Sequence, residues 1–217
     1  VVTAAHVADL QAKKGIYVGG YKKLVQITKP FVTTIPPPGG RECDHYDFAF
    51  CELNQTVVGN LGTVGFFDDS MLSKNRGDTG GRPYLIMGYP TSKNKRVNVH
   101  AATVPSNLWS YIGFVAPAPM LIEKLGVSGD DHIFIAHQSK SLTFDGVVQK
   151  SVQPNGASGG VVIDLGIPRP ELLRPGAPCS GLLAGLLLER HRSDEAIVAV
   201  KIGLVVRSIR QHYMYNQ

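Results

Sequence analysis

Cysteine is scarce in this chain of 217 residues, which has only Cys43, Cys51 and Cys179. A secreted protein of this size that relied on disulfides would carry a larger and even set of cysteines. The low count argues against a disulfide framework and leads us to expect a reducing compartment, the cytoplasm. One bridge, between Cys43 and Cys51, stays open from the sequence alone.

Long apolar runs and concentrated positive charge are also lacking. The longest apolar run, 181–188, has eight residues, whereas about 20 are needed to span a bilayer. The net charge is +5, but the basic residues are scattered, and the densest group is only Lys93, Lys95 and Arg96. Nucleic-acid-binding proteins gather such charge on one face and often interleave it with aromatic residues. We therefore expect neither a membrane span nor a nucleic-acid partner.

Metal-binding motifs are a third absence. The seven histidines and three cysteines form neither C-x-x-C nor H-E-x-x-H, the spacings that bring ligands together on one turn or one helix face. We expect no metal and no other cofactor.

Glycine (24) and proline (14) are abundant, and helix-period apolar stripes are rare. Short apolar stretches between such residues indicate strands joined by tight turns. This pattern predicts an all-β chain that ends in a helix, rather than a wound α/β sheet. The expected strands, of which the first is the end of a strand, lie within 1–7, 22–29, 31–35, 46–53, 83–89, 97–104, 133–137, 142–149, 161–165, 182–189 and 196–206. Helices are expected over 119–125 and 207–215, with one helical turn over 70–74.

The polar, glycine-rich stretch that ends at residue 82 is interpreted as a connection between two halves. We therefore divide the chain into a first β-barrel over 1–60, a linker over 61–82, a second β-barrel over 83–206 and a C-terminal helix over 207–217.

Three short motifs carry the residue types that amide hydrolysis needs: TAAH over 3–6, DFAF over 47–50 and GASGG over 156–160. A serine hydroxyl becomes an effective nucleophile when an imidazole accepts its proton, and that imidazole needs a carboxylate to fix its tautomer. Glycines beside the serine let the backbone turn so that its amides converge on the developing oxyanion. Each motif alone also fits an ordinary structural residue, whereas the three together favour a catalytic triad.

The order and spacing of these motifs resemble the signatures of chymotrypsin-like serine proteases. His6 precedes Asp47 by 41 residues, and Asp47 precedes Ser158 by 111. The resemblance implies two six-stranded antiparallel β-barrels packed together, with the active site in the cleft between them. It implies a serine endopeptidase with Ser158 as nucleophile, His6 as general base and then general acid, and Asp47 as the partner that orients His6. Because the chain starts close to His6, we expect its first barrel to lack the N-terminal strands.

The resemblance also implies how a peptide is held. The backbone amides of Gly156 and Ser158 are expected to form the oxyanion hole. The strand around 187–190 is expected to pair with the peptide as an added strand. The residues of this strand assigned to substrate binding are Leu187, Leu188 and Glu189.

The resemblance also implies the position of the specificity pocket, whose base in that family is formed by the residue about six before the serine. Val152, six residues before Ser158, is expected at the base of the pocket, followed by Gln153. Neither offers a carboxylate to a basic side chain, so we expect a protein or peptide substrate cleaved without a preference for lysine or arginine. The two leucines on the wall favour small or apolar side chains. The active geometry is expected to be either constitutive or set by a regulatory partner or an upstream domain.

Alternatives follow from the same residues. Asp44 lies near the second motif, but the two residues that follow it, His45 and Tyr46, do not continue as a buried strand. The GASGG motif also fits G-x-S-x-G of α/β-hydrolase-type esterases, which need a helix after the serine and the order serine, acid, histidine. A non-catalytic binding module with the same chymotrypsin-like fold is the other reading, although such a scaffold has no need of all three triad residues.

Overall fold

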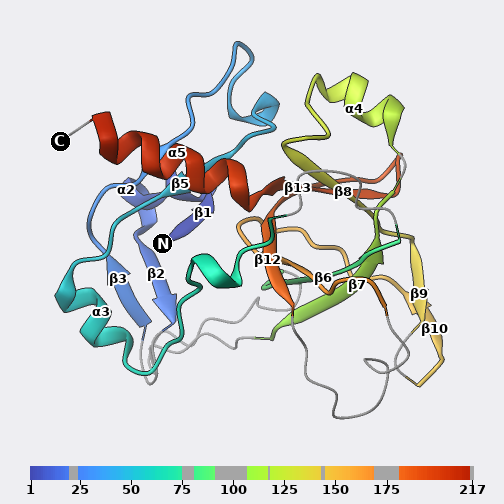
Figure 1. Cartoon of the computed structure of the whole chain (residues 1–217), viewed down its shortest axis with the longest axis horizontal. Coiled ribbons are helices and arrows are strands. Elements are labelled where there is room, and N and C mark those ends of the chain that lie inside the picture. Colours follow the sequence, from blue (N-terminus) through green and yellow to red (C-terminus); the bar gives the residue numbers. More distant parts are fainter. Residues whose placement is uncertain are drawn as a thin grey trace.

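The computed structural model describes residues 1–19, 24–74, 81–90, 107–116, 118–142, 145–168 and 181–215. More of these residues lie in strands than in helices. The longest helix among them, α5 (Ile202–Tyr215), ends the described part of the chain and runs across the molecule (Figure 1). The largest sheet contains β6 (Pro83–Gly88), β7 (Trp109–Phe114), β8 (His132–Ala136), β11 (Val161–Asp164), β12 (Leu182–His191) and β13 (Ala196–Lys201). The other strands are β1 (Val2–Ala4), β2 (Ile16–Gly19), β3 (Leu24–Ile27), β4 (Val32–Thr33), β5 (Phe48–Phe50), β9 (Lys140–Leu142) and β10 (Val148–Lys150).

The six-stranded sheet confirms the prediction of a β-rich second half. Its strand order is β7-β6-β11-β12-β13-β8, and every neighbouring pair is antiparallel. The sheet curls until its two outer strands approach each other: Val115 forms an isolated bridge with Ile135, and the Ala116 amide donates to the Phe134 carbonyl at 2.8 Å. The result is a half-barrel with an apolar interior.

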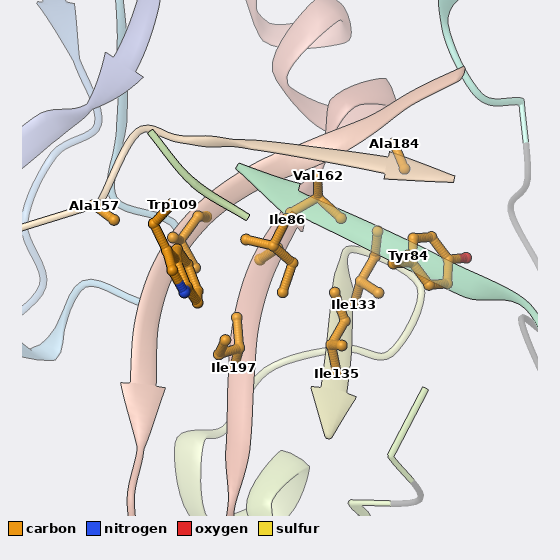
Figure 2. Close-up of a cluster of buried hydrophobic side chains, with 11 residues drawn as sticks. Tyr84, Ile86, Trp109, Ile133, Ile135, Ala157, Val162, Ala184 and Ile197 are labelled. Carbon is orange, nitrogen blue, oxygen red and sulfur yellow. The ribbon is translucent and has the colours of Figure 1, made fainter. Parts of the chain in front are cut away.

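Alternating side chains fill that interior. Along β6 every second residue is buried, which places Tyr84 and Ile86 on the inner face, as the period of two along a strand requires. Figure 2 shows these two side chains gathered with Val162, Ile135 and Ile197 from other strands of the same sheet. The sequence pattern therefore fixes which face of the sheet forms the core.

The first half is smaller and contains two separate sheets. One has the order β1-β5-β4, and the other is the β2–β3 hairpin. In β5 the side chains of Phe48 and Phe50 are buried in a cluster with Leu186 of β12 and Val205 of α5. One apolar core thus joins the two halves and the C-terminal helix.

The C-terminal helix begins at Ile202 and not at residue 207, so the prediction of a strand over 196–206 is wrong beyond Lys201. The run of Val and Ile residues there resembles a strand because β-branched residues favour extended backbone. The helix forms because Ile202, Val205 and Ile209, at helical spacing, pack together on the core that joins the halves.

Three further differences concern local elements. The expected strand over 142–149 is instead the β9–β10 hairpin, which turns near Gly146, where φ is +80°. A helix that was not predicted, α3 (Gln55–Leu61), lies just before the expected linker, and Asn54 caps it by accepting the Val57 amide at 2.8 Å. Strands β2 and β7 were not predicted, and the expected strand over 97–104 lies outside the described residues.

Other local predictions are confirmed or nearly so. The helix over 119–125 is α4 (Pro119–Leu125), and the predicted helical turn is η2 (Asp69–Met71). The bridge left open between Cys43 and Cys51 is not formed, because both side chains are free thiols. Among the described residues, the helices are all too short or too polar to cross a membrane.

Candidate active site

A cavity of about 430 Å³ lies between the two halves of the molecule. Its lining combines His6, which directly follows β1 and Ala5, with residues of the loop before β5, of the turn before β11 and of strand β12. These residues are His6, Arg41, Glu42, Asp44, Asp47, Pro154, Asn155, Gly156, Ser158, Leu187, Leu188, Glu189 and Arg190. The three residues predicted as a triad therefore open onto one cavity, although they are far apart in the sequence.

His6 is brought to Asp47 by the pairing of two short strands. In the β1–β5 ladder Ala4 lies opposite Phe48, and the Ala5 amide donates to the Asp47 carbonyl at 3.0 Å. Directly after β1 the chain turns into the short helix α1 (Ala5–Ala8), which carries His6. The small alanines allow this close approach, and the imidazole therefore faces the carboxylate at the start of β5.

Asp47 holds His6 at two points. Its Oδ1 accepts the His6 backbone amide at 2.9 Å, and its Oδ2 lies 2.5 Å from the ring Nδ1. Asp47 is 6% exposed, whereas the His6 side chain is 43% exposed. The hydrogen bond from the ring to Asp47 raises the pKa of His6 above its usual value, while partial burial opposes that rise. Nδ1 is thus committed to Asp47, and Nε2 is the ring atom left for proton transfer.

Asp44, the alternative acid, has a different role. Its Oδ2 accepts hydrogen bonds from Arg41 Nη1 at 2.6 Å and from Thr34 Oγ1 at 2.7 Å. Its Oδ1 accepts the Asp47 backbone amide at 3.1 Å. Asp44 therefore orders the loop that presents Asp47, and Asp47 is the carboxylate that contacts the histidine.

Ser158 lies just beyond a tight turn. The Ala157 amide donates to the Pro154 carbonyl at 2.8 Å, and Gly156 between them has φ +79°. A positive φ at the third residue is the mark of a type II turn and favours glycine. Among the described residues, the amides of Gly156 and Ser158 donate to no acceptor. Two backbone donors beside the hydroxyl are therefore available to an incoming oxyanion.

The serine turn is anchored to β12. The Gly159 amide donates to the Leu187 carbonyl, and the Leu187 amide donates to the Gly160 carbonyl, both at 2.8 Å. Within the described part of the chain, the Ser158 hydroxyl and the His6 ring form no direct hydrogen bond. Catalytic hydrogen bonds are often long in unliganded enzymes and tighten when substrate binds.

The predicted substrate-binding residues fall into two groups. Leu187, Leu188 and Glu189 line the cavity, although the two leucine residues are almost entirely buried. Glu189 Oε1 lies 2.9 Å from His45 Nδ1, which ties β12 to the first half. Val152 is not part of the lining; it packs against the apolar interior of the half-barrel.

Two polar residues of this region, Arg190 and His137, were not predicted as site residues. Arg190, at the far end of β12, lines the cavity and donates through Nη1 to Gln153 Oε1 at 2.6 Å. It also donates through Nε to His137 Nδ1 at 2.8 Å. The sequence signal was an arginine at the end of an apolar strand, which by itself indicates only a strand terminus.

His137 is fully buried, and its pKa is lowered to about 4 by burial and by the neighbouring Arg190 charge. It is therefore neutral at physiological pH. Among the described residues, no group of three His, Cys, Asp or Glu side chains has the arrangement of a metal site.

No family model matches this chain, and no curated protein sequence matches it. Among solved structures, one that is similar to it is described as a Glu endopeptidase in complex with MPD. The TM-score is 0.46 and the sequence identity is 14%, over 92% of this chain and 74% of that chain.

Proposed function

We propose that this protein is a serine endopeptidase that uses Ser158, His6 and Asp47 to cleave peptide bonds through an acyl-enzyme. The observation that carries the proposal is the meeting of three features at one cavity: an imidazole held by a carboxylate, a serine hydroxyl, and two backbone amides that donate to no acceptor among the described residues. Each supplies a part that amide hydrolysis requires.

In the first half-reaction, the Ser158 oxygen bonds to the carbonyl carbon of the substrate while its proton moves to His6 Nε2. The carbonyl oxygen becomes an oxyanion and accepts hydrogen bonds from the Gly156 and Ser158 amides. His6 then gives its proton to the leaving nitrogen as the carbon–nitrogen bond breaks. Asp47 stabilises the transient imidazolium through its hydrogen bond to the ring.

In the second half-reaction, water attacks the ester on Ser158. His6 removes a proton from the water and returns a proton to the serine oxygen as the ester bond breaks. The products are two shorter peptides and the regenerated enzyme. This cycle needs no cofactor and takes a protein or peptide as its substrate.

The antiparallel sheet disfavours an α/β-hydrolase-type esterase. In that fold the serine lies between a strand and a helix in a largely parallel sheet. Here a turn precedes Ser158, and β11 follows it between two antiparallel neighbours.

The proposal is tested with a fluorophosphonate probe and a peptide library on the purified chain. We expect covalent labelling of wild-type protein at Ser158 and cleavage of a subset of peptides. Ser158→Ala is expected to abolish both, with an unchanged far-UV spectrum and unfolding midpoint. Ser151→Ala provides the matched control, because this buried serine lies outside the cavity lining, and it should label normally if folded.

Absence of labelling and cleavage in folded wild-type protein would contradict the proposal and favour a non-catalytic binding module. Labelling that persists in Ser158→Ala would place the nucleophile elsewhere.

A further inference from the structure

We propose that the cavity beside Ser158 selects an acidic side chain, glutamate or aspartate, on the residue whose carbonyl is attacked, and that Arg190 is the residue that binds it. This inference deepens the proposed function and rests on it for the position of the scissile bond. It replaces the expectation of small or apolar side chains, which considered the leucines of β12 and not the arginine that follows them.

The guanidinium of Arg190 is fixed by two neutral partners. Nε donates to His137 Nδ1, and Nη1 donates to the amide oxygen of Gln153. His137 is neutral because burial and the adjacent cation lower its pKa to about 4. Neither partner offsets the charge of Arg190, and Nη2 donates to no acceptor among the described residues.

Arg41 and Glu189, two other charged side chains of the cavity, have ion-pair partners, unlike Arg190. Arg41 is paired with Asp9 and Asp44, at 2.9 and 2.6 Å. Glu189 lies 2.9 Å from His45 and 3.1 Å from His191. Thus the second cation of the cavity has carboxylate partners, unlike Arg190.

The two remaining carboxylates of the lining do not neutralise Arg190. Asp47 is engaged by His6, and Glu42 is exposed, so that water screens its charge. Glu195 attracts Arg190 through space, but no ion pair joins them in the described chain. A partly buried cation without a carboxylate partner costs desolvation energy, which a bound anion would offset.

The position of Arg190 determines which part of the substrate would meet it. Gln153, its partner, directly precedes the turn that carries Ser158 and its two amide donors. Leu187 is hydrogen-bonded to Gly159 and Gly160, the two residues that follow Ser158, and Arg190 lies three residues further along the same strand. The side chain of the residue bound covalently to Ser158 therefore enters the space that Arg190 borders.

A guanidinium recognises a carboxylate through two parallel N–H···O bonds, which a neutral amide of the same shape cannot match. A basic substrate side chain would instead meet a like charge, which is a penalty in a partly dehydrated site. The expected preference is therefore acidic over the isosteric amide, with lysine and arginine least favoured.

The test uses peptides that differ only at the residue before the scissile bond, carrying Glu, Gln, Asp, Asn, Leu or Lys. For wild-type protein we expect kcat/KM for Glu to exceed that for Gln by about 10- to 100-fold, the range of a charge-assisted pair. In Arg190→Gln this ratio should fall to about one. Arg192→Gln removes the same charge from an exposed position two residues away and should retain the wild-type ratio.

A binding experiment distinguishes a failure of this inference from a failure of the proposed function. Product peptides ending in Glu or Gln are titrated into Ser158→Ala protein, and the Glu peptide should bind at least about tenfold more tightly. If fluorophosphonate labels Ser158 but both ratios are near one, the acidic selectivity is overturned and the protease assignment stands. If labelling fails while the binding preference remains, the protease assignment falls and the acid-binding role of Arg190 stands. Should Arg190→Gln fail to fold, the kcat/KM ratio of wild-type protein and the binding ratio of Ser158→Ala protein still decide whether the site selects an acidic side chain.

Discussion

Gly159 lies so close to Thr3 that a Cβ atom at position 159 would be 2.6 Å from Thr3 Oγ1 and 3.0 Å from the Ala4 nitrogen. Thr3 is in β1, the strand that leads to His6, and Gly159 follows Ser158. This contact therefore limits how closely Ser158 and His6 can approach each other. It also explains why the serine motif needs a glycine after the serine as well as before it.

Gly159→Ala should therefore destabilise the protein and impair catalysis together. The residue has φ +82°, which costs an alanine about 1–2 kcal/mol, and the collision with Thr3 adds about 1–3 kcal/mol. Gly146→Ala is the matched control, since Gly146 has φ +80° and open space around its Cβ position. Denaturant unfolding should show the larger loss for Gly159→Ala; equal losses would mean that the contact with Thr3 is not tight.

Asp47→Asn should move the pH profile of catalysis. Only neutral His6 can accept the serine proton, and Asp47 raises its pKa above the ordinary 6.5. The acidic limb of the wild-type kcat/KM profile is therefore expected above pH 6.5. Without the carboxylate the limb should shift to lower pH, and kcat should fall about 10³- to 10⁴-fold.

The matched control for that experiment is Asp9→Asn. Asp9 raises the pKa of His6 only by its charge, as a smaller effect than the Asp47 hydrogen bond, so its loss should shift the limb slightly and leave kcat nearly unchanged. The protonation of His6 also affects the stability of the fold. Because the folded-state pKa of His6 is raised, its contribution to the free energy of unfolding is complete below the unfolded-state pKa and is lost as the pH rises through the folded-state pKa. An acidic limb that stays in place in Asp47→Asn would contradict the assigned role of Asp47.

Gly156→Ala should reduce kcat with a much smaller effect on KM. At φ +79° an alanine is strained, and relaxation of the turn would point the Gly156 amide away from the developing oxyanion. Loss of one such donor typically costs about 10²- to 10³-fold in kcat. Steady-state kinetics and the fluorophosphonate labelling rate both report the change. Unaltered kcat in a folded variant would exclude the Gly156 amide from the oxyanion hole.

Asp164→Ala should destabilise the second half without a direct effect on the site. Asp164 is 2% exposed, and its Oδ2 lies 2.8 Å from Arg82 Nη2. Removing one partner of a buried pair typically costs about 3–5 kcal/mol. Asp69→Ala, which breaks the exposed Asp69–Arg210 pair, should cost about 0–1 kcal/mol. Similar unfolding midpoints for the two variants would show that the buried pair adds little.

Residues with a distinctive local environment could be predicted from the sequence. Ser158 is surrounded by glycines, Asp47 precedes a buried apolar strand, and His6 follows small residues that permit close strand pairing. These features depend on neighbours within a few positions, so they remain visible in the linear chain. The same reasoning predicted the strand β6 and the short helix α4, because strand propensity and turn-forming residues act locally.

The tertiary structure decided what depends on packing between distant segments. The C-terminal helix takes in Ile202 and Val205, whose side chains favour strands, because the core offers those residues a helical face to pack against. Arg190 enters the cavity because the curled sheet brings β12 beside Gln153 and the buried His137. The sequence thus identified the residues proposed as a triad, whereas the selectivity inferred for the site depends on a charge whose partners lie 37 and 53 residues away. Local patterns do not encode such pairings, because they depend on how the sheet closes.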